Sequence, residues 1–224
     1  MTLARATSII LAKELRTEFR SRQLLGTTAV FVLIVIVLFS FTFNPTATES
    51  RRFGPGLLWL AFLFAGSLML QSSFLREQTN DTLSALRLAP IEPFSIIAGK
   101  MAANFLFLML VEVILLPVFA VLYNVAILPV LPQLFLVLSM GTIGLAATGT
   151  VFSAVAAQAR LRELLLPLLL LPVLAPVLIA STEATIGVLQ DPSELSLVWL
   201  TFLACFDVIF LTAAWMVGEY LLEE

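Results

Sequence analysis

The sequence contains no histidine, only one cysteine and few charged residues. Without histidine, the commonest general base, metal ligand and haem axial ligand is missing. Cys205 alone cannot form an internal disulfide or a thiolate cluster that would hold a metal. A Walker A loop is also missing, because Gly99-Lys100 has no glycine at the required spacing before it. We therefore expect no catalytic residue, no metal and no cofactor bound by this chain, and ATP, if it is used, on a partner subunit.

The composition predicts an integral membrane protein. Of the 224 residues, 60% are hydrophobic and 12% are charged, whereas soluble domains are about 45–50% apolar and about 25% charged. So few polar side chains cannot cover the surface of a soluble fold. We expect an all-α membrane protein in which residues 1–224 form a single membrane domain.

Six segments are apolar enough, and near enough to the roughly 20 residues required, to cross a bilayer as helices. A long uncharged stretch after Glu112 is divided into two spans by Pro129 and Pro132. The predicted spans cover residues 24–43, 55–75, 101–123, 131–156, 164–181 and 196–218.

Lysine and arginine set the orientation of a membrane protein, because they are retained on the cytoplasmic side. With six spans, the N-terminus, the second and fourth loops and the C-terminus share one side. That side carries ten of the 12 basic residues, and only Arg51 and Arg52 lie on the other. We therefore expect both termini in the cytoplasm.

Residues 7–22 are expected to form an amphipathic helix on the cytoplasmic membrane surface rather than a cleavable signal. An apolar stripe at helical spacing is opposed by a polar face. The stripe comprises Leu11, Ala12, Leu15 and Phe19, and the opposite face comprises Lys13, Arg16, Thr17 and Arg20. The alternative is a solvated basic segment without membrane contact.

The long cytoplasmic loop between the second and third spans contains a short predicted helix. Asp81 is suited to cap its N-terminus, because its carboxylate accepts the free amide hydrogens of the first turn. Pro90 ends it, since the residue before a proline avoids the helical region. Leu83 and Leu86 share one face, with Arg87 beside them. So short a helix needs a surface to pack against; the alternative is an ordinary capped connector.

The sequence predicts an amphipathic N-terminal helix, six spans and a capped cytoplasmic helix between the second and third spans. This arrangement resembles the permeases of ABC-2-type ATP-binding-cassette exporters, and among them the haem exporter protein B (CcmB) family. The resemblance rests on the run KELRTEFRSR at residues 13–22, TLSALRLAPI at 82–91 and Gly99-Lys100. A further match is the proline-rich LLLPLLLLPVLAPVLIAST at 164–182. Together the segments cover nearly the whole chain. At Asn80-Asp81 the sequence departs from the family, where a glycine is expected beside the acidic residue.

The resemblance implies that residues 80–89 form a coupling helix that docks on a separate ATPase subunit, the CcmA of this family. Leu83 and Leu86 would be its apolar contacts and Arg87 an ion-pair partner. It further implies CcmC-, CcmD- and CcmE-like partners, a second permease copy and haem as the handled ligand. No nucleic acid is implied. The compartment implied is the bacterial inner membrane.

Two carboxylates lie within the predicted spans, Glu112 in the third and Asp207 in the sixth. Charged groups there are costly and face protein or a water-filled cavity. Each could gate a pathway or contact a substrate, or could join helices through hydrogen bonds. They could also pair with each other, or with the polar residues Gln71, Ser72 and Ser73 of the second span.

The fifth span carries three prolines, Pro167, Pro172 and Pro176, which predict a kinked or broken helix. The resemblance also implies a re-entrant turn around residues 182–196. In the fourth span, Gly149, Ser153 and Ala157 are spaced by four residues, which suits close helix packing. That packing could be with a second permease or within one chain. The six methionines are expected to fill the core rather than to ligate haem.

The sequence therefore favours a permease that works with an ATPase in haem delivery for cytochrome c maturation. An ABC-2 permease for a lipid, polysaccharide or drug would share the same architecture. A membrane scaffold that moves nothing is an alternative from another class. An enzyme is disfavoured, because two isolated carboxylates do not make an active site.

Overall fold

The structure is a computed structural model that describes residues 2–42, 47–79, 92–157, 162–190 and 192–218. Over these residues the chain forms seven α-helices and one short 3-10 helix. They are α1 (Leu3–Ser21), α2 (Gln23–Thr42), α3 (Ala47–Thr79), α5 (Pro93–Leu122), η1 (Leu128–Val130), α6 (Leu131–Ala157), α7 (Arg162–Leu189) and α8 (Leu197–Gly218). Six of the helices contain segments long and apolar enough to cross a membrane, which confirms the predicted number of spans.

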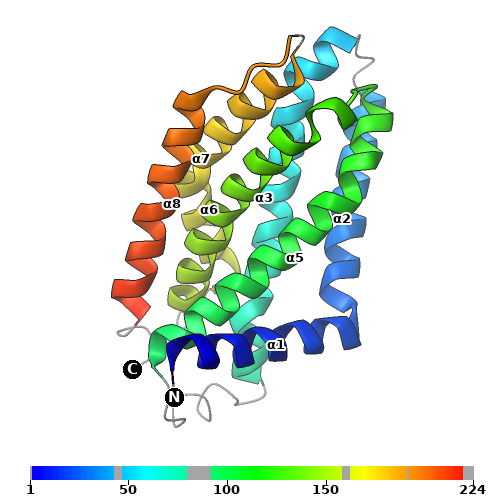
Figure 1. Cartoon of the computed structure of the whole chain (residues 1–224). Helices are drawn as coiled ribbons and strands as arrows, with labels where there is room; N and C mark the ends of the chain where they lie inside the picture. The colour runs from blue at the N-terminus through cyan, green and yellow to red at the C-terminus, as the bar shows by residue number, and fades with distance from the viewer. Residues whose placement is uncertain (1, 43–46, 80–91, 158–161, 191, 219–224) are drawn as a thin grey trace.

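The six long helices form a bundle, and α1 lies across one end of it (Figure 1). We call this end the α1 end. The start of α5 and the last residue of α8 are also located there, since Gly218 packs against Phe94 and Ile97 of α5. The opposite end holds η1 and the connection from α7 to α8 (Figure 1).

Helix α6 lies at the centre of the bundle and contacts α3, α5, α7 and α8. Small residues allow these approaches, because a larger side chain would overlap a neighbouring helix. A Cβ atom on Gly141 would overlap the buried ring of Trp59 on α3. One on Gly149 would overlap Leu70, also on α3. The close packing of α3 on α6 therefore depends on glycines.

The row of small residues on α6 joins α6 to α3 within one chain. Gly149 lies against Leu70, and the Ser153 hydroxyl donates a hydrogen bond to the Leu70 carbonyl at 2.6 Å. The sequence left open whether this row packs within one chain or against a second permease. The contacts of Gly149 and Ser153 support packing within the chain.

Three helices extend further than the predicted spans. Helix α3 covers Ala47–Thr79 rather than residues 55–75, α5 starts at Pro93, eight residues before the expected start at Met101, and α7 continues to Leu189 rather than ending at Ser181. In α5 and α7 the difference involves polar residues. Lys100 appeared to end a span but is buried in α5, and the Thr185 hydroxyl donates to the Ser181 carbonyl within the helix.

Helix α7 is not interrupted by its prolines, so the prediction of a broken helix is wrong. It runs as one α-helix through Pro167, Pro172 and Pro176; such prolines are tolerated in membrane helices because neighbouring groups satisfy the freed carbonyls. The predicted kink stays a prediction. The turn expected at residues 182–196 begins only after Leu189, where α7 ends. The Glu194 amide in this turn donates a hydrogen bond back to the Gly187 carbonyl of α7 at 2.9 Å.

The amphipathic pattern of α1 was predicted only in part. Leu11 and Leu15 pack against the core as expected, but Phe19 is 54% exposed. The buried side chains instead lie four and then eight residues apart on one face, and they include a carboxylate: Ala6, Ile10 and Glu18. Hydropathy predicts which residues avoid water, but it does not recognise a carboxylate buried through a hydrogen bond.

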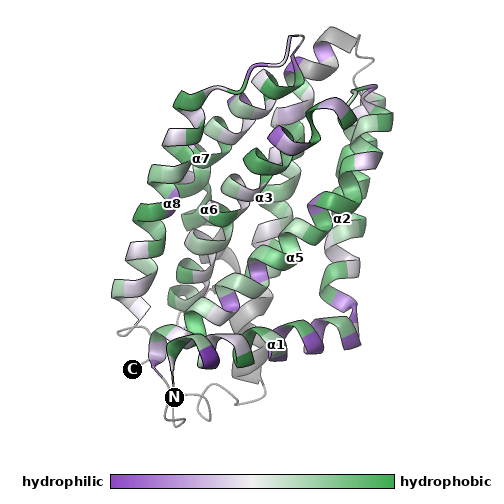
Figure 2. Cartoon of the chain, viewed as in Figure 1, coloured by the Kyte–Doolittle hydropathy of each residue, from purple (hydrophilic) through white to green (hydrophobic). Residues whose placement is uncertain are grey.

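The outer helices α2 and α8 consist mostly of hydrophobic residues (Figure 2). Ile34 and Leu38 of α2 and Val208 and Ile209 of α8 are each more than half exposed. Exposed apolar side chains on a membrane-spanning helix are expected where the helix contacts lipid or another membrane subunit.

We predict opposite effects from the same substitution at two glycines. Gly141→Ala should destabilise the protein by about 1–3 kcal/mol, because the added methyl group overlaps the Trp59 ring. Gly26→Ala should stabilise α2 by about 0.5–1 kcal/mol, because nothing lies within 4 Å of the new Cβ and alanine favours helix. Thermal unfolding of the purified variants in detergent tests this, and equal midpoints would contradict the packing.

Candidate functional site

Lys100 is a fully buried lysine on α5 that pairs with Glu14 on α1. The ammonium Nζ lies 2.9 Å from Glu14 Oε1, and the exposed side-chain fractions are 0% for Lys100 and 14% for Glu14. The preceding residue, Gly99, brings the two helices together. A Cβ there would lie 2.7 Å from the Ile10 Cβ and 3.1 Å from the Thr7 carbonyl oxygen.

The Glu14 carboxylate faces two ammonium groups. Burial by itself would raise its pKa, but Lys100 and Lys13 together outweigh burial, so the pKa of Glu14 lies below its usual range. Lys13 lies 3.3 Å away on a side chain that is 42% exposed, and such surface pairs contribute little. The Lys100 contact is the closer and the more buried of the two, at 2.9 Å with no exposed fraction on the lysine side chain.

Glu18, one helical turn beyond Glu14, joins α1 to α2. Its side chain is fully buried, and Oε1 accepts a hydrogen bond from the Leu25 amide in the first turn of α2 at 2.8 Å. The chain turns between the helices at Arg22, which has a left-handed backbone with φ of 53°. A carboxylate that accepts an amide hydrogen at a helix N-terminus stabilises that helix.

Two buried polar pairs connect α5 to α6. The Asn104 amide donates to the Thr150 hydroxyl at 3.0 Å, and the Thr142 hydroxyl donates to Glu112 Oε1 at 2.7 Å. The pairs are eight residues apart on each helix, in opposite directions, which is the register of antiparallel neighbours. Hydrogen bonds between helices hold such a register in a membrane, where water does not compete.

The two intramembrane carboxylates contact the same helix but do not bond to each other. Glu112 bonds Thr142, and its Oε2 has no hydrogen-bond partner among the described residues. Within the same part of the chain, Asp207 Oδ1 has none either, and it lies next to Gly144, where a Cβ would be 3.0 Å away. The suggested pairing of Glu112 with Asp207 is therefore wrong. The Thr142 contact supports a helix-joining role for Glu112.

A cleft of about 220 Å³ lies between α3 and α7. It is lined by Gly56, Trp59, Leu60, Leu178, Ile179, Thr182 and Glu183. The Trp59 indole donates to the Thr185 hydroxyl at 2.9 Å, which ties α3 to α7 beside the cleft. The lining is mostly apolar, with Glu183 its single carboxylate.

The residues predicted to dock on an ATPase lie outside the described residues. They are Asp81, Leu83, Leu86 and Arg87, and all four remain predictions. In the part of the chain that the structure describes, no three histidine, cysteine, aspartate or glutamate side chains gather as a metal site.

Comparison with known proteins assigns the family. Residues 5–217 match the sequence model of the CcmB protein. A protein from Pseudomonas aeruginosa named Heme exporter protein B is 35% identical, over 88% of each chain. Proteins of the same name from Rhodobacter capsulatus and Paracoccus denitrificans are 34% and 33% identical, over 78% of this chain and 79% and 80% of theirs.

This chain belongs to the CcmB family. It is a multi-pass membrane protein of a family of permease subunits. Such permeases are not enzymes, and the ATPase of the transporter is a separate chain. The relatives are bacterial proteins, and the resemblance described above also implies a bacterial protein.

The sequence analysis missed the polar pairs that join the helices of this CcmB-family chain. Glu14, Glu18 and Lys100 lie in segments that carry the family resemblance, but none of them was predicted to join helices. One signal was present, since Glu14 and Glu18 continue the four-residue spacing of Ala6 and Ile10. Nothing in the sequence shows that Asn104 meets a threonine 46 residues later.

We predict that Thr142→Val destabilises the protein by about 1–3 kcal/mol, because it leaves the buried Glu112 carboxyl without its hydrogen bond. Thr212→Val is the matched control, since this hydroxyl is exposed and bonds only the Val208 carbonyl of its own helix. Thermal unfolding in detergent, followed by tryptophan fluorescence, compares the two. If both variants unfold like the wild type, the Glu112 bond does not stabilise the bundle.

Proposed function

We propose that this chain is the membrane permease subunit of an ABC transporter that exports or delivers haem for the maturation of c-type cytochromes. The observation that carries the proposal is the family match over residues 5–217, with relatives named Heme exporter protein B over most of their length. Six candidate membrane spans and the lack of a Walker A loop agree with a permease whose ATP is hydrolysed elsewhere.

The α1 end of the bundle is assigned to the cytoplasm. Basic residues concentrate in the segments that meet at this end, as the orientation rule requires. Helix α1 then lies at the inner membrane surface, with Arg5, Arg16 and Arg20 exposed on the side away from the bundle. Exposed arginines suit contact with anionic lipid headgroups.

Residues 80–89 are assigned as the coupling helix of an ABC-2-type permease, which docks on a CcmA-like ATPase. Its position supports this role, because α3 ends at Thr79 and α5 begins at Pro93, both at the α1 end. Leu83 and Leu86 make the apolar contacts and Arg87 an ion pair. The wider assembly includes CcmC-, CcmD- and CcmE-like proteins and a second permease copy in the bacterial inner membrane.

Haem is assigned as the handled ligand, with its iron held by another subunit or a haem chaperone. We assign the iron to another protein because this sequence has no histidine to act as an axial ligand. The permease then contributes movement of its helices rather than coordination of the iron. Glu112 and Asp207 are assigned to helix packing.

The direct test is covalently bound haem in c-type cytochromes. We expect the haem stain of membranes to disappear when the gene for this chain is deleted, and to return when it is supplied in trans. An unchanged stain would overturn the haem assignment and favour an exporter of lipid, polysaccharide or drug. A stain that survives inactivation of the ATPase nucleotide site would instead favour a scaffold that moves nothing.

Docking on the ATPase has its own prediction. Leu86→Asp places a charge on the apolar face of residues 80–89 and should abolish co-purification with the ATPase while membrane insertion is retained. Ser84→Asp is the matched control, since the same charge is added about 130° away from the face that Leu83 and Leu86 share. Equal co-purification of both variants would remove the docking role of this face.

A further inference from the structure

Helix α1 is attached to α5 by a row of side chains on one face. Ala6 and Ile10 are buried in this row, and Glu14 continues it with its ion pair to Lys100. Gly99 allows the backbones to approach so closely that a Cβ there would meet Ile10. The apolar contact and the ion pair lie one turn apart, so together they determine both the position and the register of α1 along α5.

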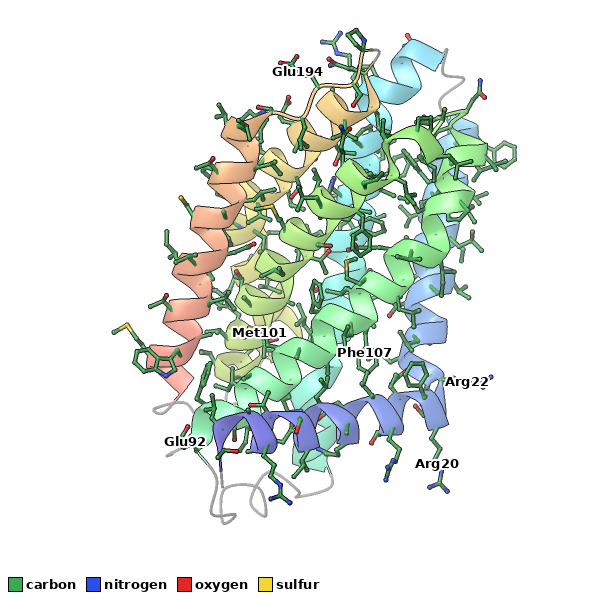
Figure 3. The ribbon with its side chains drawn as sticks, in the orientation of Figure 1. Arg20, Arg22, Glu92, Met101, Phe107 and Glu194 are labelled. Carbon is green, nitrogen blue, oxygen red and sulfur yellow. The ribbon has the colours of Figure 1, made fainter. Side chains whose placement is uncertain are left out.

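The same row attaches α1 to α2 at its other end. Glu18 accepts the Leu25 amide hydrogen, and the Arg22 amide donates to the Glu18 carbonyl at 2.6 Å. Figure 3 shows Arg20 and Arg22 at the corner between α1 and α2, and Glu92 near the opposite end of α1, next to the start of α5. Helix α1 therefore connects the cytoplasmic ends of two different spans.

The attachment of α1 to α5 lies close along the chain to the proposed docking segment, residues 80–89. Residues 80–89 precede α5, which begins at Pro93, and Lys100 lies two helical turns further along. A displacement of the start of α5 would therefore act directly on the Lys100–Glu14 pair. Helix α2 has no such direct connection to residues 80–89 along the chain.

We propose that Glu14 and Lys100 are positioning residues that make α5, α1 and α2 move as one unit. In this unit, α1 transmits a displacement of the start of α5 to α2. The inference rests on the proposed function, because it takes residues 80–89 to be the site where the ATPase acts.

The ion pair reinforces the register that the apolar contact sets. Stability alone does not explain the pair, because replacing a buried ion pair by apolar residues is often neutral or stabilising. The two charged groups lie 2.9 Å apart, and a shift of α1 along α5 would separate them. The pair therefore adds to the register already given by the close packing of Gly99 on Ile10.

The test measures whether α1 stays fixed on α5 in the assembled transporter. Spin labels are placed at Ala12→Cys on α1 and Leu106→Cys on α5, both exposed, after Cys205→Ser removes the native thiol. In the complex with its ATPase, we expect one narrow distance distribution that is the same without nucleotide and with trapped ATP. A distance that changes between these states would overturn the proposal.

Four variants separate the ion pair from general packing. Glu14→Gln and Lys100→Gln should broaden the distance distribution and abolish the haem stain while the ATPase still co-purifies. The charge exchange E14K/K100E should restore both the narrow distribution and the stain. Lys13→Gln is the matched control and should behave like the wild type, because its side chain is 42% exposed and a surface pair of this kind contributes little.

The outcomes distinguish this inference from the proposed function. If Glu14→Gln and Lys100→Gln behave like Lys13→Gln, or if the charge exchange restores neither readout, the positioning role is wrong. If deletion of the chain leaves the haem stain unchanged, the haem assignment is wrong, and the distance measurement still decides whether the pair holds α1. If no ATPase co-purifies with the wild type, the same measurement on the permease alone compares the variants.

Discussion

Hydrocarbon does not solvate polar groups, and this constraint accounts for the hydrogen bonds that fix how the spans pack. Backbone groups must bond within helices, so every span is helical. Side-chain polar groups are stabilised by partners on neighbouring helices, and the buried pairs Asn104–Thr150, Thr142–Glu112 and Trp59–Thr185 each join two different spans. Small residues on α6 then bring the spans close enough for these bonds to form.

Helix α1 meets the same constraint at the edge of the bundle. Lys100 is fully buried, so the chain must supply a carboxylate, and Glu14 does so from a helix that lies across the bundle end. Glu18 uses the same face to cap α2. One amphipathic helix thus holds two spans through its buried carboxylates, and its arginines remain exposed on the other side. The exposed arginines of α1 (Arg5, Arg16 and Arg20) therefore lie on a different face from Glu14 and Glu18.

The functional assignment rests on the family, and the structure adds how such a permease is built. The described residues contain helix-joining pairs and an apolar cleft lined by α3 and α7. The CcmB family match and the six candidate membrane spans both agree with a permease.

The sequence by itself determined the class of protein, the number of spans and the family, because these depend on composition, on the length of apolar runs and on the order of short motifs. It also located Glu112 and Asp207 inside spans. Only the tertiary structure decided that Glu112 bonds Thr142, that Glu14 pairs with Lys100 and that α5 and α7 extend beyond their apolar cores. The reason is physical: hydropathy scores each residue against water or lipid, whereas a buried polar side chain is stabilised by a partner far away in the sequence. Such partners become visible only when the helices are packed.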